Sequence, residues 1–200
     1  TAFDCYPLSN SQMNIWALEQ SFPGISLNNI CETIRIRGTF DIALLQKCLN
    51  LILETDSSLR IQITHTQAAM PVQYETPYVP CQFPVFDFST SNETGIQHWE
   101  SSITREVMPL LDSPLFSFAI LKIGEHEGGV FVKTHHLISD GWSQVALINR
   151  IAQTYLALLA GETILPEPAP SYRLHVEEEQ RYCASPAFER DRQFWQQTMT

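Results

Sequence analysis

The chain has 200 residues, of which 44% are apolar and 17% charged, a composition typical of one globular domain with a sizeable core. Its net charge of −10 argues against nonspecific binding to nucleic acid or to an anionic membrane surface. The five cysteines are scattered and lack Cys-x-x-Cys spacing, which argues against a disulfide framework or a zinc site, so we expect mostly buried, reduced thiols.

The first predicted helix begins at Ser9, a residue type that caps helix N-termini, and ends near Ser21 before Phe22-Pro23-Gly24. Alternating residues over 31–37 predict a half-buried strand. Asp41 then caps a second helix, whose apolar residues recur at helical spacing. Further along, the predicted elements are strands over 59–64 and 72–75, an extended loop over 77–84 and a helix over 94–108.

The second half of the chain begins with strands over 115–123 and 130–136, separated by a turn and therefore expected to pair antiparallel. A long helix follows Gly141 and ends at Gly161. A semi-rigid, proline-rich linker over 165–170 leads to two closing helices over about 171–199. Strands and helices without strict alternation predict an α+β fold, a two-layer α/β sandwich with a mixed, largely antiparallel sheet.

The most informative segment is His135-His136-Leu137-Ile138-Ser139-Asp140-Gly141, which connects a strand to a helix. Adjacent strand residues point to opposite faces, so His135 and His136 cannot share one role. Asp140 suits the free N–H groups of a helix start, and Gly141 removes a side chain where a substrate could approach. The plain alternative is a core histidine, an N-cap aspartate and a turn glycine. We favour a site because all four residues share one structural setting.

This segment resembles the central motif of condensation domains of nonribosomal peptide synthetases, in the larger family that includes chloramphenicol acetyltransferase. Weaker similarities follow in the expected order: Ser9, Gln12, Trp16 and Leu18 near the N-terminus, then Leu59 and Arg60, then Tyr172 and Phe194-Trp195. The chain departs from the pattern at Ser11 (usually Ala), Asn14 (usually Arg), Glu54-Thr55-Asp56 (usually Arg-His-Glu) and Leu174 (usually Asp).

The resemblance implies a chloramphenicol acetyltransferase-like lobe, with residues 1–200 forming the N-terminal lobe of a condensation domain. The second lobe, which contributes half of the substrate tunnel, is absent from this chain, so we expect the isolated fragment to be inactive. The implied enzyme is an acyltransferase that forms an amide between a carrier-bound acyl donor and a carrier-bound aminoacyl acceptor. Such enzymes belong to secondary metabolism and antibiotic biosynthesis.

By the same resemblance, His136 is the catalytic residue and His135 its structural neighbour. Asp140 is the scaffold carboxylate, expected to pair with Arg60 in a buried ion pair whose loss would cost about 3–5 kcal/mol. Gly141 is expected to face the tunnel.

Two further residues of the motif are candidates for the tunnel lining. Trp142 is expected to pack rather than to recognise substrate, and Ser143 to serve as a helix-start hydroxyl. No metal is required.

The implied substrates are carried on phosphopantetheine arms, and the domain itself is expected to bind no cofactor. Partners would be an upstream donor carrier, a downstream acceptor carrier, the missing C-terminal lobe and a neighbouring adenylation domain, with no nucleic acid and no membrane. The absence of a recognisable signal peptide or membrane helix favours the cytoplasm.

Two alternative functions stay open at this stage. One is the lobe of an epimerisation domain, which shares the histidine motif. The other is a non-catalytic module that docks or recruits carriers.

Overall fold

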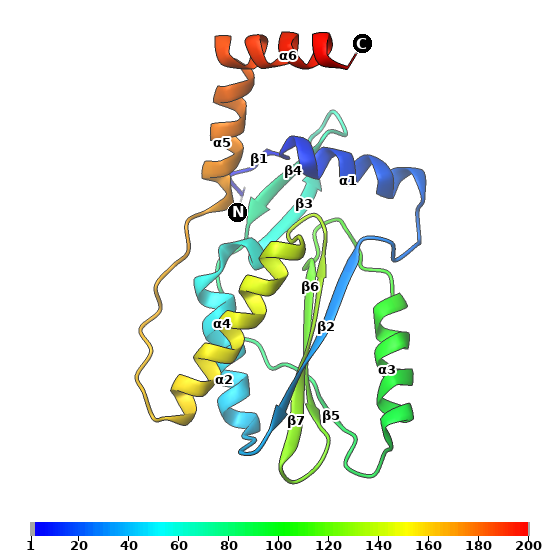
Figure 1. The fold of residues 1–200 in the computed structure, drawn as a ribbon, viewed down its shortest axis with the longest axis vertical. Helices are drawn as coiled ribbons and strands as arrows, with labels where there is room; N and C mark the ends of the chain where they lie inside the picture. Colours follow the sequence, from blue (N-terminus) through cyan, green and yellow to red (C-terminus); the bar gives the residue numbers. More distant parts are fainter. Residues whose placement is uncertain (1–2, 200) are drawn as a thin grey trace.

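The computed structural model describes residues 3–199, which form two sheets, six α-helices and a short 3-10 helix (Figure 1). The elements in chain order are β1 (Tyr6–Pro7), α1 (Asn10–Ser21), β2 (Asn29–Arg37), α2 (Ile42–Thr55), η1 (Ser57–Arg60), β3 (Ile61–His65), β4 (Pro71–Glu75), β5 (Val85–Asp87), α3 (Glu93–Arg105), β6 (Phe116–Lys122), β7 (Glu127–His135), α4 (Gly141–Leu159), α5 (Tyr172–Cys183) and α6 (Pro186–Thr198). The predicted α+β class, with a mixed and largely antiparallel sheet, is confirmed.

The main sheet has the strand order β2-β7-β6-β5. β7 pairs antiparallel with both β2 and β6, which confirms the predicted β6–β7 pair, and its last residue, His135, lies opposite Asn29 of β2. Gly129 of β7 lies too close to β2 for a side chain, because a Cβ at this position would lie 2.6 Å from the Ile34 carbonyl oxygen. β7 is buried from Gly128 to its end, so the histidine motif follows a rigid, central strand.

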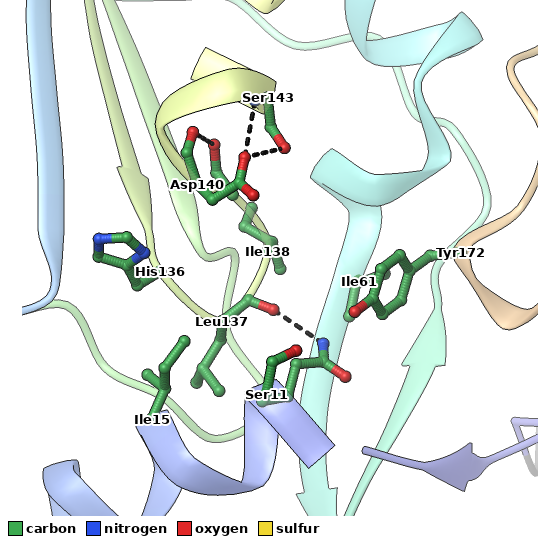
Figure 2. A pocket seen from close by; sticks show the side chains of 11 residues that line it. Ser11, Ile15, Ile61, His136, Leu137, Ile138, Asp140, Ser143 and Tyr172 are labelled. Atoms are coloured by element: carbon green, nitrogen blue, oxygen red, sulfur yellow. Dashed lines mark hydrogen bonds between the residues drawn. The ribbon is translucent and has the colours of Figure 1, made fainter. Parts of the chain in front are cut away.

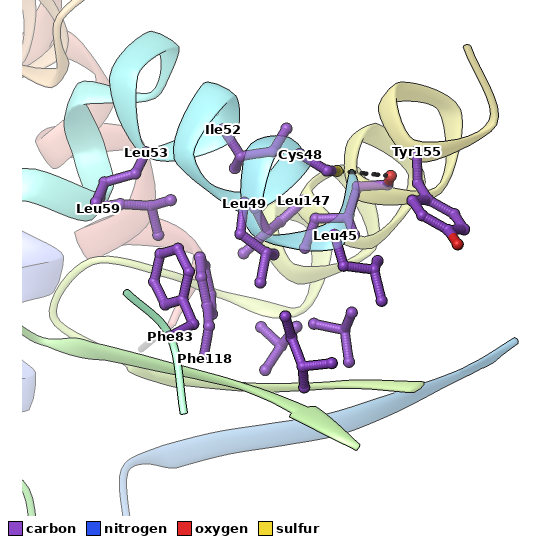
Figure 3. Close-up of a cluster of buried hydrophobic side chains, with 14 of the residues drawn as sticks. Leu45, Cys48, Leu49, Ile52, Leu53, Leu59, Phe83, Phe118, Leu147 and Tyr155 are labelled. Atoms are coloured by element: carbon purple, nitrogen blue, oxygen red, sulfur yellow. Dashed lines mark hydrogen bonds between the residues drawn. The ribbon is translucent and has the colours of Figure 1, made fainter. Parts of the chain in front are cut away.

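Helices cover both faces of the main sheet. α2 and α4 lie side by side on one face and enclose the largest core (Figures 1 and 3). That core holds Leu45, Cys48, Leu49 and Ile52 of α2, Leu147 and Ile151 of α4, and Phe118, Ile120, Val130 and Val132 of the sheet. Each such aliphatic side chain stabilises the fold by about 1.5–3 kcal/mol relative to an exposed one.

α3 packs on the opposite face of the main sheet. Trp99 of α3 contacts the ring of Phe131 with centroids 5.2 Å apart. The buried Lys133 of β7 donates hydrogen bonds to the carbonyl oxygens of Ile103 and Glu106. A cation there suits the negative end of the α3 dipole, so β7 also fixes the end of α3.

The small sheet has the order β1-β4-β3 and packs against α1. The predicted cap at Ser9 is confirmed, since its hydroxyl accepts from the Gln12 N–H while the Gln12 side chain accepts from the Ser9 N–H. Trp16 of α1 is buried with Ile61 of β3 and with Leu137, which directly follows the two histidines. α1 therefore reaches the histidine motif through the second core.

Several element boundaries differ from the prediction. The strand expected over 59–64 begins only at Ile61, because Asp56 caps a 3-10 turn over the four preceding residues. The helix expected over 94–108 ends at Arg105. The short β5 was not predicted as a strand, since its three residues carry no alternating pattern and pair in parallel with β6.

The end of the chain has the predicted linker and two helices. Ala169 in the linker donates its N–H to the Thr55 carbonyl at the end of α2. α6 buries no residue and extends away from the rest of the molecule (Figure 1). No helix among residues 3–199 is long and apolar enough to cross a membrane.

The expectation that most thiols are buried is wrong. Only Cys48 is buried, whereas Cys5 and Cys81 are exposed and the other two are half-buried. Burial raises the pKa of the Cys48 thiol to about 12. Cysteine spacing carries no information on burial, and the exposed pair lies outside helices and strands.

Candidate active site

The histidine motif connects the end of β7 to the start of α4. The His135 N–H donates to the Leu115 carbonyl on one side of the strand, and the His136 N–H donates to the Asn28 carbonyl on the other, each at 2.9 Å. The Ile138 N–H then closes a turn on the His135 carbonyl at 3.0 Å. The backbone of both histidines is therefore fixed before the chain enters α4.

His136 lies on the wall of a pocket of about 150 Å³ (Figure 2). The pocket is lined from α1, β3, the motif, α4 and α5 by Ser11, Gln12, Ile15, Ile61, His136, Leu137, Ile138, Ser139, Asp140, Ser143 and Tyr172. The His136 side chain is half-buried. Neither of its ring nitrogens has a hydrogen-bond partner among residues 3–199, so both are available to a bound molecule.

His135 points to the other side of the strand and is only 3% exposed. Its Nδ1 accepts from the Leu137 N–H at 3.2 Å, so the ring proton belongs on Nε2, which faces Glu19 Oε1 at 3.3 Å. Burial lowers the pKa of His135 although the Glu19 carboxylate acts in the opposite direction. The lowered pKa and the two contacts both describe a neutral ring whose nitrogens face Glu19 and the Leu137 N–H.

Asp140 is the N-cap of α4. Its Oδ1 accepts from the Ser143 N–H at 2.8 Å and from the Ser143 hydroxyl at 2.7 Å (Figure 2). These hydrogen bonds lower the pKa of the Asp140 carboxyl. The structure thus agrees with the interpretation of Ser143 as a helix-start hydroxyl.

The expected ion pair between Asp140 and Arg60 is absent from residues 3–199. The Arg60 guanidinium instead donates to the carbonyl oxygens of Leu53, Glu54, Asp56 and Thr76. Arg60 therefore holds the last turn of α2, where a cation is favourable. Asp140 is exposed and accepts its hydrogen bonds from Ser143. The side chains of Asp140 and Arg60 therefore have separate hydrogen-bond partners.

Gly141 and Trp142 begin α4. A Cβ at Gly141 would meet no atom within 4 Å, so open space rather than backbone geometry surrounds this position. Trp142 is 86% exposed, and the expectation that it packs is wrong for this structure. At the start of α4, the described residues leave most of this side chain uncovered.

Two polar residues of α1 were not predicted as part of the site. Glu19 and Gln12 are buried and contact His135 and the Leu137 carbonyl, respectively. The sequence marks Gln12 only as a motif match. The spacing could have pointed to both residues, because Gln12, Trp16 and Glu19 fall on one face of the helix. Polar residues on a helix face, however, usually indicate that the face is exposed to solvent.

No group of three histidine, cysteine, aspartate or glutamate side chains in the described part of the chain could hold a metal ion. The chemistry available at the pocket is that of the His136 imidazole, which can accept or donate a proton. A base held at a rigid strand end suits acyl or proton transfer.

Comparison with known proteins places this geometry in a family. The protein-family model named condensation domain matches residues 3–200 of this chain. A plipastatin synthase chain of Bacillus subtilis is 31% identical over 193 residues, which cover 96% of this chain and 8% of that protein. A surfactin synthase chain of the same species is 30% identical over 195 residues, covering 95% of this chain and 5% of that protein.

Solved structures show the same fold. The starter condensation domain of rhizomide synthetase RzmA superposes with a TM-score of 0.87 at 24% identity, and the first condensation domain of the CDA synthetase with a TM-score of 0.83 at 23% identity. This chain is covered to 97% and 96%, respectively, but spans 49% of each of those chains. The family match over nearly all residues and the shared fold agree: the chain belongs to the condensation domain family of nonribosomal peptide synthetases.

Proposed function

We propose that this chain forms the N-terminal, motif-bearing lobe of an enzyme that joins a carrier-bound acyl donor to a carrier-bound aminoacyl acceptor. The acceptor α-amine attacks the donor thioester carbon, the carbon–sulfur bond breaks, and the products are an amide and the free thiol of the donor arm. The observation that carries the proposal is the half-buried His136 ring on the pocket wall, whose two nitrogens have no hydrogen-bond partner in the described part of the chain.

His136 takes the proton that the amine loses, or orients the amine for attack. A thioester is already activated, so alignment of the two reactants contributes much of the rate. An imidazole suits the proton transfer because histidine is the side chain most often used as a general acid or base. Asp140 and Gly141 support this role by starting α4 beside the pocket without filling it.

The family supports a proposal for the substrate class. Two relatives are named as a nonribosomal peptide synthase and as a lipopeptide synthase, and a mutant of the RzmA starter domain has been solved in complex with C8-CoA. For this chain we propose phosphopantetheine-bound thioesters, presented by an upstream and a downstream carrier domain beside an adenylation domain. Because the chain spans about half of the solved condensation domains, we further propose that a second lobe completes the tunnel and that this lobe alone is inactive.

The test uses the full-length protein with one acyl-loaded donor carrier and one aminoacyl-loaded acceptor carrier, with amide product followed by mass spectrometry. We expect His136→Ala to reduce the rate by roughly 100-fold or more, the range of a lost general base. His126→Ala, in the exposed turn between β6 and β7, is the matched control and should react normally.

Three outcomes would count against the proposal. Full activity of His136→Ala would remove the assigned role of that imidazole. Exchange of the acceptor α-proton with deuterated solvent in the absence of amide would favour the epimerisation domain. Carrier binding with neither reaction would favour a recruitment module.

A further inference from the structure

One face of α1 is directed at the histidine motif. Its three buried residues, Gln12, Trp16 and Glu19, are four and three positions apart, so they line one side of the helix. Trp16 packs in the second core, whereas the two polar residues on either side of it contact the segment that carries His136. The motif is therefore bordered by a helix face that is polar at both ends and apolar in the middle.

The Glu19 end of this face holds the imidazole of His135. Glu19 Oε1 accepts from His135 Nε2 at 3.3 Å and from the Asn28 side-chain amide at 2.6 Å. With its proton on Nε2, His135 offers Nδ1 to the Leu137 N–H. Asn28 in turn offers its carbonyl to the His136 N–H. Through these two residues, Glu19 connects to the backbone on both sides of the His136 Cα.

The Gln12 end holds the next peptide group. Gln12 Nε2 donates to the Leu137 carbonyl and to Gln73 Oε1, each at 2.8 Å. Its Oε1 accepts from the Ser9 N–H and from Gln73 Nε2. All hydrogen-bonding positions of this amide are thus occupied, and its orientation is fixed by α1 and β4 together.

Buried polar groups cost free energy unless they are hydrogen-bonded, and the side chains of Gln12 and Glu19 are buried with hydrogen-bond partners. Both polar residues of α1 nevertheless contact the tripeptide centred on His136. The ring of His136 has no hydrogen bond of its own among the described residues, so its orientation depends on its backbone. Misplacement of a reacting group by about 1 Å can reduce a rate by roughly 100-fold.

We propose that Glu19 and Gln12 are positioning residues for His136, with Glu19 acting through the His135 side chain and Gln12 through the Leu137 carbonyl. This inference rests on the proposed function, since it assigns the purpose of the α1 face to the reaction at His136. Neither residue touches the reacting atoms.

The kinetic test compares variants of the full-length protein in the amide-forming assay. Glu19→Met keeps the side-chain length but removes the acceptor, while Glu19→Gln keeps an acceptor oxygen for His135. We expect Glu19→Met and Gln12→Ala to reduce the maximal rate about 10- to 100-fold, with less than a threefold change in the acceptor-carrier concentration that gives half the maximal rate. Glu19→Gln should restore the rate to within about threefold of the unaltered protein.

The matched control is Gln46→Ala. Gln46 lies on α2 and hydrogen-bonds to the N–H and carbonyl of Phe83, so its loss removes two hydrogen bonds without touching the motif. It should leave the maximal rate unchanged. Hydrogen–deuterium exchange of the peptide spanning 133–140, measured without substrates, should accelerate in Glu19→Met and stay unchanged in Gln46→Ala.

A second comparison places Glu19→Met in the His136→Ala background. If Glu19 acts through His136, the double variant reacts no more than about twofold slower than His136→Ala, because the two changes remove one function. A further tenfold loss would overturn the positioning role. A full maximal rate in Glu19→Met would overturn it too, whether or not the exchange accelerates.

The assay separates the two levels of inference. If the unaltered protein makes no amide, the proposed function fails and the positioning role falls with it. If the unaltered protein makes amide, His136→Ala does not, and Glu19→Met reacts fully, only the positioning role is overturned.

Discussion

Asp140 and Arg60 provide the sharpest test of the structure, because the family resemblance predicts an ion pair and the geometry shows two independent contacts. Asp140→Ala removes the two hydrogen bonds accepted from Ser143. Loss of an exposed N-cap of this kind costs about 1 kcal/mol, whereas breaking a buried ion pair costs about 3–5 kcal/mol. We therefore expect a loss of about 1 kcal/mol in the free energy of unfolding.

Arg60→Met removes the hydrogen bonds to the carbonyls at the end of α2. Because Arg60 is half-buried, water can replace part of these contacts, and we expect a loss of about 2 kcal/mol, within the range for hydrogen bonds to charged groups. The two residues share no partner, so the double variant should lose about 3 kcal/mol, with a coupling energy below about 0.5 kcal/mol.

The assay is urea denaturation of the 200-residue chain, followed by tryptophan fluorescence and circular dichroism. Asp140→Asn is the control, since asparagine caps a helix as well as aspartate does. A coupling energy above about 1.5 kcal/mol would show a direct interaction and refute the assignment of separate roles.

The stability lost in Asp140→Ala should depend on pH. Hydrogen bonds from Ser143 lower the pKa of Asp140 in the folded chain, so the ionised cap stabilises the fold above the unfolded-state pKa. This contribution disappears as the pH falls through the lower, folded-state pKa. The difference in unfolding free energy between the unaltered chain and Asp140→Ala should therefore shrink on acidification.

Three further outcomes are expected from single positions. Gly141→Leu should keep the melting temperature within about 2 °C, because a Cβ at this position meets open space and exposed substitutions change stability little. The same variant should abolish amide formation in the full-length protein. Normal turnover would contradict a substrate path at this position. Gly129→Ala should destabilise the chain by about 1–3 kcal/mol through overpacking against the β2 backbone. Gly124→Ala is the control and should leave stability unchanged, because a Cβ there meets no atom within 4 Å. Equal melting temperatures of the two variants would contradict the close contact at Gly129. Cys48, with its pKa raised to about 12 by burial, should resist iodoacetamide at about pH 8 until urea unfolds the chain, whereas labelling at the rate of the exposed thiols would show an open core.

Local chemistry in the sequence predicted much of the fold. The helix starts at Ser9, Asp41 and Asp140 are capped as expected, because a side-chain acceptor two or three residues before a free N–H acts within one turn. The β6–β7 pair also follows from local pattern, since two apolar runs joined by a short turn have few other ways to pair. Such signals depend on neighbours in sequence and need no knowledge of the rest of the fold.

Choices between distant partners could not be predicted in this way. Arg60 could pair with a carboxylate or with backbone carbonyls, and only the position of the last turn of α2 decides. The pairing of β5 with β6 joins Val85 to Ile120, far apart in the chain, through a strand of three residues. The exposure of Trp142 depends on what surrounds the start of α4. In each case the composition permits both outcomes, and tertiary geometry selects one.

The division of labour between the two histidines shows how the two kinds of information combine. Strand alternation requires that His135 and His136 face opposite sides, but it does not say which one faces a substrate. The structure supplies an asymmetry: His135 uses both ring nitrogens within the scaffold, on Glu19 and on the Leu137 N–H, and is 3% exposed. A ring with both nitrogens occupied and no solvent cannot exchange a proton with a substrate. His136 is half-buried at a pocket wall, and its ring has no hydrogen bond among the described residues. The pattern of hydrogen bonds therefore supports the proposal that His136 is the reactive histidine.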